Sequence, residues 1–163
     1  MNRSQNLEKD GAVKFSGNFD TEFKKLEKQC KKFYPKGSLN IHRKRRWYWE
    51  IEAKDVIKIA DFCFNKLGCR FSIASAEDTP KGFTILYHFS FDKLGVMINL
   101  RVTLPHDDPK VDSLTVLGRG FEWIEREMHE LLGIEFIGLD DTRHLLLPDD
   151  SPAGYYPLRR SFG

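Results

Sequence analysis

The sequence predicts an α+β fold, in which a mixed β-sheet is covered by helices and followed by an extended C-terminal tail. Three observations predict it: segments with apolar residues at helical spacing, a strand-like alternation between the first two of them, and three consecutive apolar runs separated by turn residues. Helices that flank a strand and a meander, instead of alternating regularly with strands, favour α+β over a doubly wound class. The 163 residues have the length of one domain.

The first predicted helix runs from Asp20 to Phe33. Its apolar residues recur every three or four positions, and Pro35 and Gly37 supply a stop. Asp20 is placed to serve as its N-cap. The polar residues 1–18 that precede the helix are expected to form a flexible N-terminal lead.

A strand is expected over residues 38–52, where Trp47, Trp49 and Ile51 alternate with polar residues. The same stretch carries a basic cluster, residues 42–46, beside these aromatic side chains. Cationic and stacking side chains are also what a nucleic-acid surface needs. No other nucleic-acid motif accompanies them, so an exposed strand or hairpin edge, or a docking surface for an acidic partner, is the preferred interpretation. Attraction to an anionic membrane surface is a weaker alternative.

A second helix is expected from Asp55 to Leu67, with Gly68 as its C-terminal cap. Three apolar runs separated by turn sequences then predict a meander. These runs are residues 70–74, 83–91 and 96–104.

After Pro105 the sequence predicts a loop, and then a third helix over residues 121–132 that ends at Gly133. The apolar positions expected to face the core are Trp123, Ile124, Met128, Leu131 and Leu132. The α+β domain is therefore expected to span residues 19–133. Residues 134–163 show little periodicity and are expected to form an extended tail that docks on a partner subunit.

Composition excludes several classes of function. The 26 Lys and Arg balance 24 Asp and Glu, and a formal charge of +2 gives no indication of a nucleic-acid partner. No apolar stretch reaches the ~20 residues that a membrane-spanning helix requires. The three cysteines form no CxxC pair, which favours a reducing, cytoplasmic setting, and Cys63 and Cys69 lie in apolar surroundings typical of buried structural thiols.

The densest group of ionisable residues lies on the third predicted helix. Glu122, Glu125 and His129 share a face, which makes a metal site conceivable, but pairing of Arg126 with Glu122 or Glu130 across one turn is the stronger interpretation. The chain contains no nucleophile elbow, dinucleotide fingerprint or phosphate-binding loop. We therefore assign no catalytic, cofactor-binding or metal-ligating residue, and these observations favour an interaction or scaffold protein.

One segment gives a more specific indication of function. Residues 121–160, which begin FEWIEREMHELLGIEF, resemble the signature of the small hydrophilic 30 kDa subunit of complex I, the respiratory-chain NADH dehydrogenase. The same family includes subunits of membrane-bound, energy-converting NiFe hydrogenases. The motif and partner-interface positions that the resemblance marks are Trp123, Glu125, Arg126, Glu127, Gly133, Phe136, Arg143, Pro148, Pro157, Leu158, Arg159 and Arg160.

The sequence departs from the quinone-reducing members at two places. His129-Glu130 stands where they show an aromatic-Asp pair, and residues 139–144 replace their His-Pro-Asp-Leu-Arg-Arg while keeping Arg143. These departures favour the hydrogenase branch by analogy. The 30 kDa subunit of an NADH or other donor:quinone oxidoreductase is the alternative, and a free-standing nucleic-acid-binding domain is a remote one.

The resemblance implies a non-catalytic subunit on the cytoplasmic side of a membrane-bound complex. It would scaffold the large catalytic subunit of a ferredoxin-linked, ion-translocating hydrogenase, beside a small iron–sulfur subunit. The NiFe centre and the iron–sulfur clusters would belong to those partners, with no cofactor, nucleic acid or membrane span on this chain. Arg126, Arg143, Arg159 and Arg160 would offer fork-shaped donors to carboxylates on a neighbour.

Overall fold

The computed structural model describes residues 19–162. The predicted N-terminal lead, residues 1–18, lies outside the described residues. The helices are α1 (Phe19–Phe33), α2 (Val56–Asp61), which continues into a wider turn at Phe62–Lys66, and α3 (Glu122–Leu132). The strands are β1 (Ser38–Arg43), β2 (Arg46–Glu50), β3 (Arg70–Thr79), β4 (Gly82–Phe91), β5 (Val96–Leu104), β6 (Lys110–Asp112) and β7 (Glu135–Ile137). Single 3-10 turns lie at Ala53–Asp55, Leu114–Leu117, Arg119–Phe121 and Arg160–Phe162.

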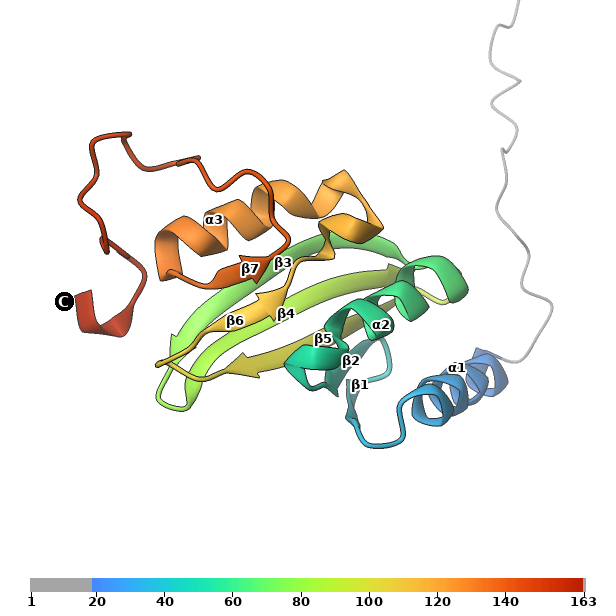
Figure 1. Ribbon diagram of the computed structural model, residues 1–163. Coiled ribbons are helices and arrows are strands. Elements are labelled where there is room, and N and C mark those ends of the chain that lie inside the picture. The colour runs from blue at the N-terminus through green and yellow to red at the C-terminus, as the bar shows by residue number, and fades with distance from the viewer. Residues whose placement is uncertain (1–18, 163) are drawn as a thin grey trace, which may run out of the picture.

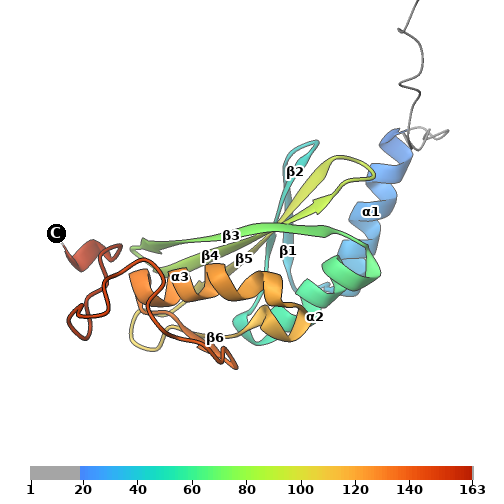
Figure 2. The same cartoon turned by 90° about the horizontal axis from the view of Figure 1, so that it is seen from above.

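The main sheet has five strands in the order β1-β2-β5-β4-β3, as Figure 1 shows. Strands β3, β4 and β5 form the predicted antiparallel meander, and β2 runs parallel to β5, which makes the sheet mixed. The α+β class is therefore confirmed. Alternate side chains of β4, from Phe83 to Phe89, are buried, and so are those of β5, from Val96 to Leu104. Helices α2 and α3 lie on one side of the meander (Figure 2), which places the core there.

The single strand expected over residues 38–52 is wrong, because this stretch forms a hairpin. Strands β1 and β2 pair antiparallel, and the chain reverses at Lys44 and Arg45. The indole Nε1 of Trp47 donates to the Lys44 carbonyl oxygen at 3.0 Å and so stabilises the reversal. Only β2 shows the expected alternation, with Trp47 and Trp49 buried, whereas β1 is an exposed edge.

The predicted helices are confirmed with small differences at their ends. Phe23, Leu26 and Cys30 of α1 are buried, as their spacing predicts. Asp20 lies inside the first turn, where its carboxylate binds the Lys44 ammonium at 2.6 Å. Gly68 follows the second helix with a φ of 70°, the left-handed conformation expected of a C-terminal cap.

Two short strands lie in segments expected to be irregular. Strand β6, in the expected loop after Pro105, pairs parallel with β7. Ile134, Phe136 and Leu139 are buried around β7, so this part of the chain belongs to the core. The extended segment therefore begins after Leu139 and not at residue 134, because apolar side chains of β7 complete the packing of the domain.

Candidate partner-binding surface

Helix α3 buries three charged side chains beside Met128 and Leu132, and it exposes its tryptophan. Glu125, Arg126 and Glu130 are 0%, 8% and 5% exposed, whereas Trp123 is 65% exposed. The prediction that Trp123 faces the core is therefore wrong. A buried charge is costly unless hydrogen bonds or an opposite charge compensate it. The partners of these three side chains come from the loop before α3 and from the segment after β7.

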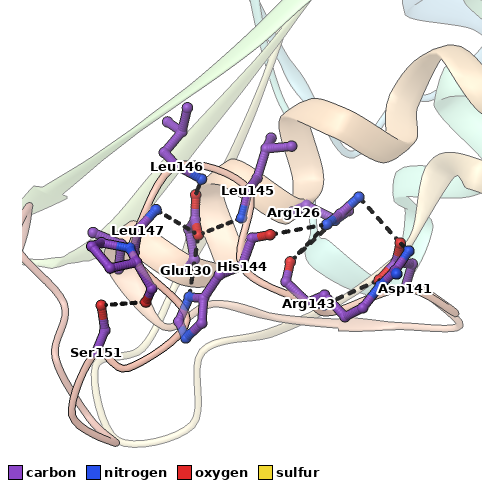
Figure 3. A network of polar contacts seen from close by, with 10 residues as sticks. Arg126, Glu130, Asp141, Arg143, His144, Leu145, Leu146, Leu147 and Ser151 are labelled. Carbon is purple, nitrogen blue, oxygen red and sulfur yellow. Dashed lines mark hydrogen bonds and ion pairs between the residues drawn. The ribbon is translucent and has the colours of Figure 1, made fainter.

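Glu130 organises the segment after β7. Its carboxylate accepts hydrogen bonds from the backbone N–H groups of Leu145 and Leu146, at 2.8 and 2.7 Å, and a longer one from Leu147 (Figure 3). Burial by itself raises the pKa of this carboxyl, but the bonds from the three backbone N–H groups and from His144 outweigh burial and lower the pKa. An ionised Glu130 thus fixes three consecutive residues over α3.

Arg126 fixes the same segment one turn earlier. Its Nη2 donates to the Arg143 carbonyl oxygen at 2.8 Å, and its Nη1 lies 3.1 Å from the Asp141 carboxylate (Figure 3). Asp141 also accepts from the Arg143 guanidinium and from the Arg143 backbone N–H, and these bonds hold the pKa of the Asp141 carboxyl below its usual range. Arg126 therefore pairs with Asp141, and not with Glu122 or Glu130 as expected from helical spacing.

Glu125 ties α3 to the loop that precedes it. Its carboxylate accepts from the Ser113 hydroxyl at 2.5 Å and from the Leu114 backbone N–H at 2.8 Å. Burial raises the pKa of the Glu125 carboxyl to about 7, although both hydrogen bonds act in the opposite direction. The buried hydroxyl of Tyr87 has no hydrogen-bond partner among residues 19–162. Burial raises the pKa of that phenol, and the nearby Glu125 charge raises it further.

The last part of the segment fastens to the C-terminal end of α3. Arg159 Nε donates to the Leu132 carbonyl oxygen at 2.7 Å, and the Leu158 N–H donates to the Leu131 carbonyl oxygen at 3.1 Å. These donors satisfy carbonyl groups that a helix end leaves free. The Arg159 guanidinium also lies 4.2 Å from the centre of the Tyr156 ring. Gly133 allows Arg159 to lie against the end of α3, since a Cβ at residue 133 would lie 2.4 Å from Arg159 Nη2.

An apolar groove lies between α3, β3 and the segment that Glu130 holds. It has a volume of about 710 Å³, and three of its lining side chains are more than half exposed: Trp123 at 65%, Leu146 at 62% and Ile73 at 54%. Phe71 and Phe121 contribute to its apolar lining. Large apolar side chains gathered in one exposed place are typical of a protein-binding surface. We refer to this feature, lined by Trp123, Leu146 and Ile73, as the α3–β3 groove.

The other motif residues divide between the groove, the core and the surface. Glu127 lines the groove, and Phe136 is buried in β7. Pro148 begins a turn, in which its carbonyl oxygen accepts from the Ser151 N–H and hydroxyl, and Pro157 is half-buried. The Arg160 side chain is exposed, while its backbone N–H donates to Asp78 at 3.0 Å.

The four arginines expected to offer donors to a neighbouring subunit differ in what they bind within the chain. Arg126 and Arg159 are used within the chain, because their donors satisfy the carbonyl groups of the extended segment and of the α3 end. Arg143 pairs with Asp141 but its side chain is 84% exposed. Arg143 and Arg160 are thus the two of the four whose side chains are exposed.

Sequence reasoning misses two residues that shape this surface. It leaves Ser113 in an undifferentiated loop, although a serine just before an apolar run is a common N-cap, and its Oγ accepts from the Thr115 N–H at 3.1 Å. It also places Ile73 in an apolar strand without indicating which way the side chain points. The irregular register between Phe71 and Ile73 turns Ile73 outward, and nothing in the sequence marks that bulge.

The features weighed as chemical sites have structural roles. Within residues 19–162, no three His, Cys, Asp or Glu side chains are grouped so as to hold a metal ion. The His129 Nδ1 atom lies 2.9 Å from the Ile134 carbonyl oxygen, and Glu125 is engaged with Ser113. All three cysteines are buried as free thiols. None of the described helices is both long enough and apolar enough to cross a bilayer.

The sequence matches a known family over most of its length. The family model described as the respiratory-chain NADH dehydrogenase 30 kDa subunit matches residues 49–163, which include the end of β2, the meander, α3 and the extended segment. The chain belongs to this family. The resemblance carried by residues 121–160 is thereby confirmed, and the family match also includes strands β3, β4 and β5 of the main sheet.

Family members of two kinds are among its relatives. A subunit of the NADH-quinone oxidoreductase of Ruegeria pomeroyi is 34% identical over 132 residues, which are 77% of this chain and 60% of that protein. The membrane-bound hydrogenase subunit beta of Pyrococcus furiosus is 35% identical over 92 residues, 55% of this chain and 53% of that protein. The chain thus spans little more than half the length of these relatives.

The fold is also found in a solved respiratory complex. A chain in the structure of an archaeal membrane-bound sulfane sulfur reductase, a respiratory membrane complex, superposes with a TM-score of 0.76. The superposition covers 87% of this chain and 86% of that one, at 21% sequence identity. The two chains therefore share the same arrangement of sheet and helices.

Proposed function

We propose that this chain is a non-catalytic, hydrophilic subunit of a membrane-associated, complex I-like electron-transfer complex. In this proposal the chain packs on the large catalytic subunit through the α3–β3 groove and carries no redox centre itself. Family membership supports it, since the relatives are named as subunits of oxidoreductases and hydrogenases.

The α3–β3 groove is the single observation that carries the proposal. Trp123 projects from the rigid helix α3, and Leu146 projects from a segment that Glu130 holds by backbone hydrogen bonds. Both side chains are therefore preorganised, which lowers the entropic cost of association. A tryptophan surrounded by apolar side chains, with Arg70 and Glu127 also lining the groove, has the composition expected of an interface hot spot.

Within the family, we propose the hydrogenase branch, in which the chain scaffolds the large subunit of an energy-converting, ferredoxin-linked and ion-translocating NiFe hydrogenase. Two observations support this choice: the departure of residues 139–144 from the quinone-enzyme pattern, and the similarity to the Pyrococcus hydrogenase subunit. The alternative is the 30 kDa subunit of an NADH or other donor:quinone oxidoreductase. The longer match to the Ruegeria protein favours that alternative.

The same proposal assigns cofactors and location to the assembly. The NiFe centre and the iron–sulfur clusters would belong to the large subunit and to a small iron–sulfur subunit. The chain would sit peripherally on the cytoplasmic side of the membrane and reach the bilayer only through its partners.

Affinity purification of the tagged full chain from gently solubilised membranes of its source tests the proposal. The expected result is co-purification of a large subunit, identified by peptide sequencing, whose paired CxxC motifs mark the hydrogenase branch. A large subunit without those motifs would favour the quinone branch. If no oxidoreductase subunit co-purifies with the chain, the proposed function itself is contradicted.

Matched variants connect the result to the α3–β3 groove. Trp123→Ala combined with Leu146→Ala removes the two most exposed large apolar side chains of the groove, and we expect it to reduce recovery of the large subunit by at least about tenfold. Phe19→Ala combined with Ile41→Ala removes exposed apolar side chains outside the groove. This control is expected to leave recovery unchanged.

A further inference from the structure

The described part of the chain separates its charges along the sequence. Residues 19–46 hold ten Lys or Arg and three Asp or Glu, a net charge of +7, whereas residues 47–162 hold 13 and 19, a net charge of −6. Helix α1 and the β1–β2 hairpin lie together at one end of the molecule, away from α3 and the C-terminal segment (Figures 1 and 2). The nearly neutral total therefore conceals a strongly basic end.

Six exposed cations define this basic end: Lys25, Arg43, Arg45, Arg46, Lys66 and Lys93. Contacts between elements hold them in one region. The Lys44 ammonium of the hairpin binds Asp20 of α1, and the Arg45 carbonyl oxygen accepts from the Met97 N–H at 2.9 Å, next to the turn between β4 and β5. None of the six forms an ion pair with a residue of the described range 19–162.

Three of these cations meet at a small hollow. Lys25 of α1, Lys66 after α2 and Lys93 of the β4–β5 turn line a hollow of about 240 Å³, whose lining contains one carboxylate, that of Glu22. The residues that line this hollow thus carry three positive charges and one negative charge. A negatively charged group that entered the hollow would balance part of this excess.

The surroundings of the basic end discriminate between anionic partners. Insertion into a membrane surface requires an exposed apolar face, but the apolar stripe of α1, centred on Leu26, is buried. Single-stranded nucleic acid requires exposed rings for stacking, but Trp47 and Trp49 are 1% and 0% exposed. The Tyr48 ring lies against the Arg101 guanidinium, 4.9 Å from its centre. Large apolar side chains exposed on α1 and β1 are few, Phe19 at 45% and Ile41 at 38%, so charge dominates this end. Carboxylates on a folded protein surface match such a face.

We propose that the basic end is the docking site for an acidic surface of a second protein. Carboxylates of that partner pair with the hairpin arginines Arg43, Arg45 and Arg46, and one carboxylate enters the lysine-lined hollow. Because these pairs are exposed, they are screened by salt and give fast, reversible association. The site lies apart from the α3–β3 groove, so the two surfaces can be occupied together. This inference does not depend on the large-subunit assignment.

Binding of the purified full chain to poly-L-glutamate tests the proposal. We expect Arg43→Glu, Arg45→Glu and Arg46→Glu together to weaken binding by at least about tenfold, and the wild-type affinity to fall about tenfold between roughly 50 and 300 mM salt. Lys81→Glu, Lys110→Glu and Arg119→Glu make the same charge change at exposed positions elsewhere. This matched control is expected to retain its affinity within about twofold.

Three results would overturn the proposal. Equal weakening by both triple variants would mean that net charge, and not the basic end, determines binding. Tighter binding to phosphatidylglycerol vesicles than to poly-L-glutamate would assign the surface to membranes. Tighter binding to a single-stranded oligonucleotide of equal charge would assign it to nucleic acid. If the triple glutamate variant does not fold, glutamine at the same three arginine positions is used instead. It removes the positive charges without introducing negative ones.

Discussion

Glu130 holds Leu146 in place: its carboxylate accepts a hydrogen bond from the Leu146 backbone N–H at 2.7 Å (Figure 3). The side chain of Leu146 remains 62% exposed and lines the α3–β3 groove with Trp123. A buried charge on the helix therefore positions an apolar side chain on the surface. The family signature contains residues of both kinds. Its buried Glu130 and Arg126 hold the segment after β7 in place, and this segment exposes Leu146 in the groove.

Removing the Glu130 carboxylate should release the segment that carries Leu146. Glu130→Ala leaves three backbone N–H groups without their acceptor, and we expect the free energy of unfolding to fall by about 2–3 kcal/mol. Urea unfolding and limited proteolysis around residues 140–150 measure the effect. Glu77→Ala, at an exposed strand position, should change stability by less than about 0.5 kcal/mol. Equal effects of the two substitutions would contradict the supporting role of Glu130.

Alanine substitutions at two glycines distinguish the cost of backbone strain from the cost of displacing the C-terminal segment. Gly133 and Gly138 have φ values of 71° and 87°, but a Cβ meets Arg159 and Tyr156 only at Gly133. Gly138→Ala should cost about 1 kcal/mol, the penalty of a left-handed alanine. Gly133→Ala should cost at least about 1 kcal/mol more, because Arg159 must leave the end of α3. Thermal unfolding of both variants checks this, and similar losses of stability would show that Arg159 contributes little.

Glu125 should make stability fall as pH rises. Burial raises the pKa of its carboxyl from 4.5 to about 7, so between these values the folded protein binds more protons than the unfolded chain. The stabilising contribution is complete below pH 4.5 and lost as pH rises through 7, a change of about 3 kcal/mol. Urea unfolding of Glu125→Gln should show this decline removed. A wild type and a variant with parallel pH dependence would show that Glu125 titrates normally.

The three thiols should be unreactive in the folded protein. Burial raises the pKa of Cys30 and of Cys69 to about 12, and the pKa of the Cys63 thiol is shifted well upward by the same cause. A thiol reagent at pH 8 should modify them slowly in buffer and rapidly in denaturing urea, because only the thiolate reacts. Rapid labelling of one cysteine in buffer would reveal local opening of the core at that position.

Much of the fold could be predicted from local patterns. The apolar stripe of α1, the meander and the left-handed caps at Gly68 and Gly133 follow from spacing and from the special conformation of glycine. The sequence raised a hairpin edge only as one interpretation of residues 42–46, and it could not place the turn, because Lys44 and Arg45 include no glycine, proline or asparagine. A basic pair on an exposed turn has the same appearance as a basic pair on a strand.

The site was less predictable than the fold for a physical reason. The buried carboxyl groups of Glu125 and Glu130 accept hydrogen bonds from backbone N–H groups, at residue 114 and at residues 145–147 respectively. Every residue except proline offers such a donor, so residue identity contains no signal for the pairing. Hydrophobic periodicity then assigns Trp123 to the core, although the helix uses that position for the groove.

Site-specific photo-crosslinking from position 146 tests the central claim most directly. A photoreactive phenylalanine analogue replaces Leu146 in the full chain, within the membrane complex of its source, and a second variant carries it at Ile41. The account predicts a crosslink from position 146 to the large catalytic subunit and none to that subunit from position 41. A crosslink to the large subunit from position 41 alone, or from neither position while the complex remains intact, would contradict it.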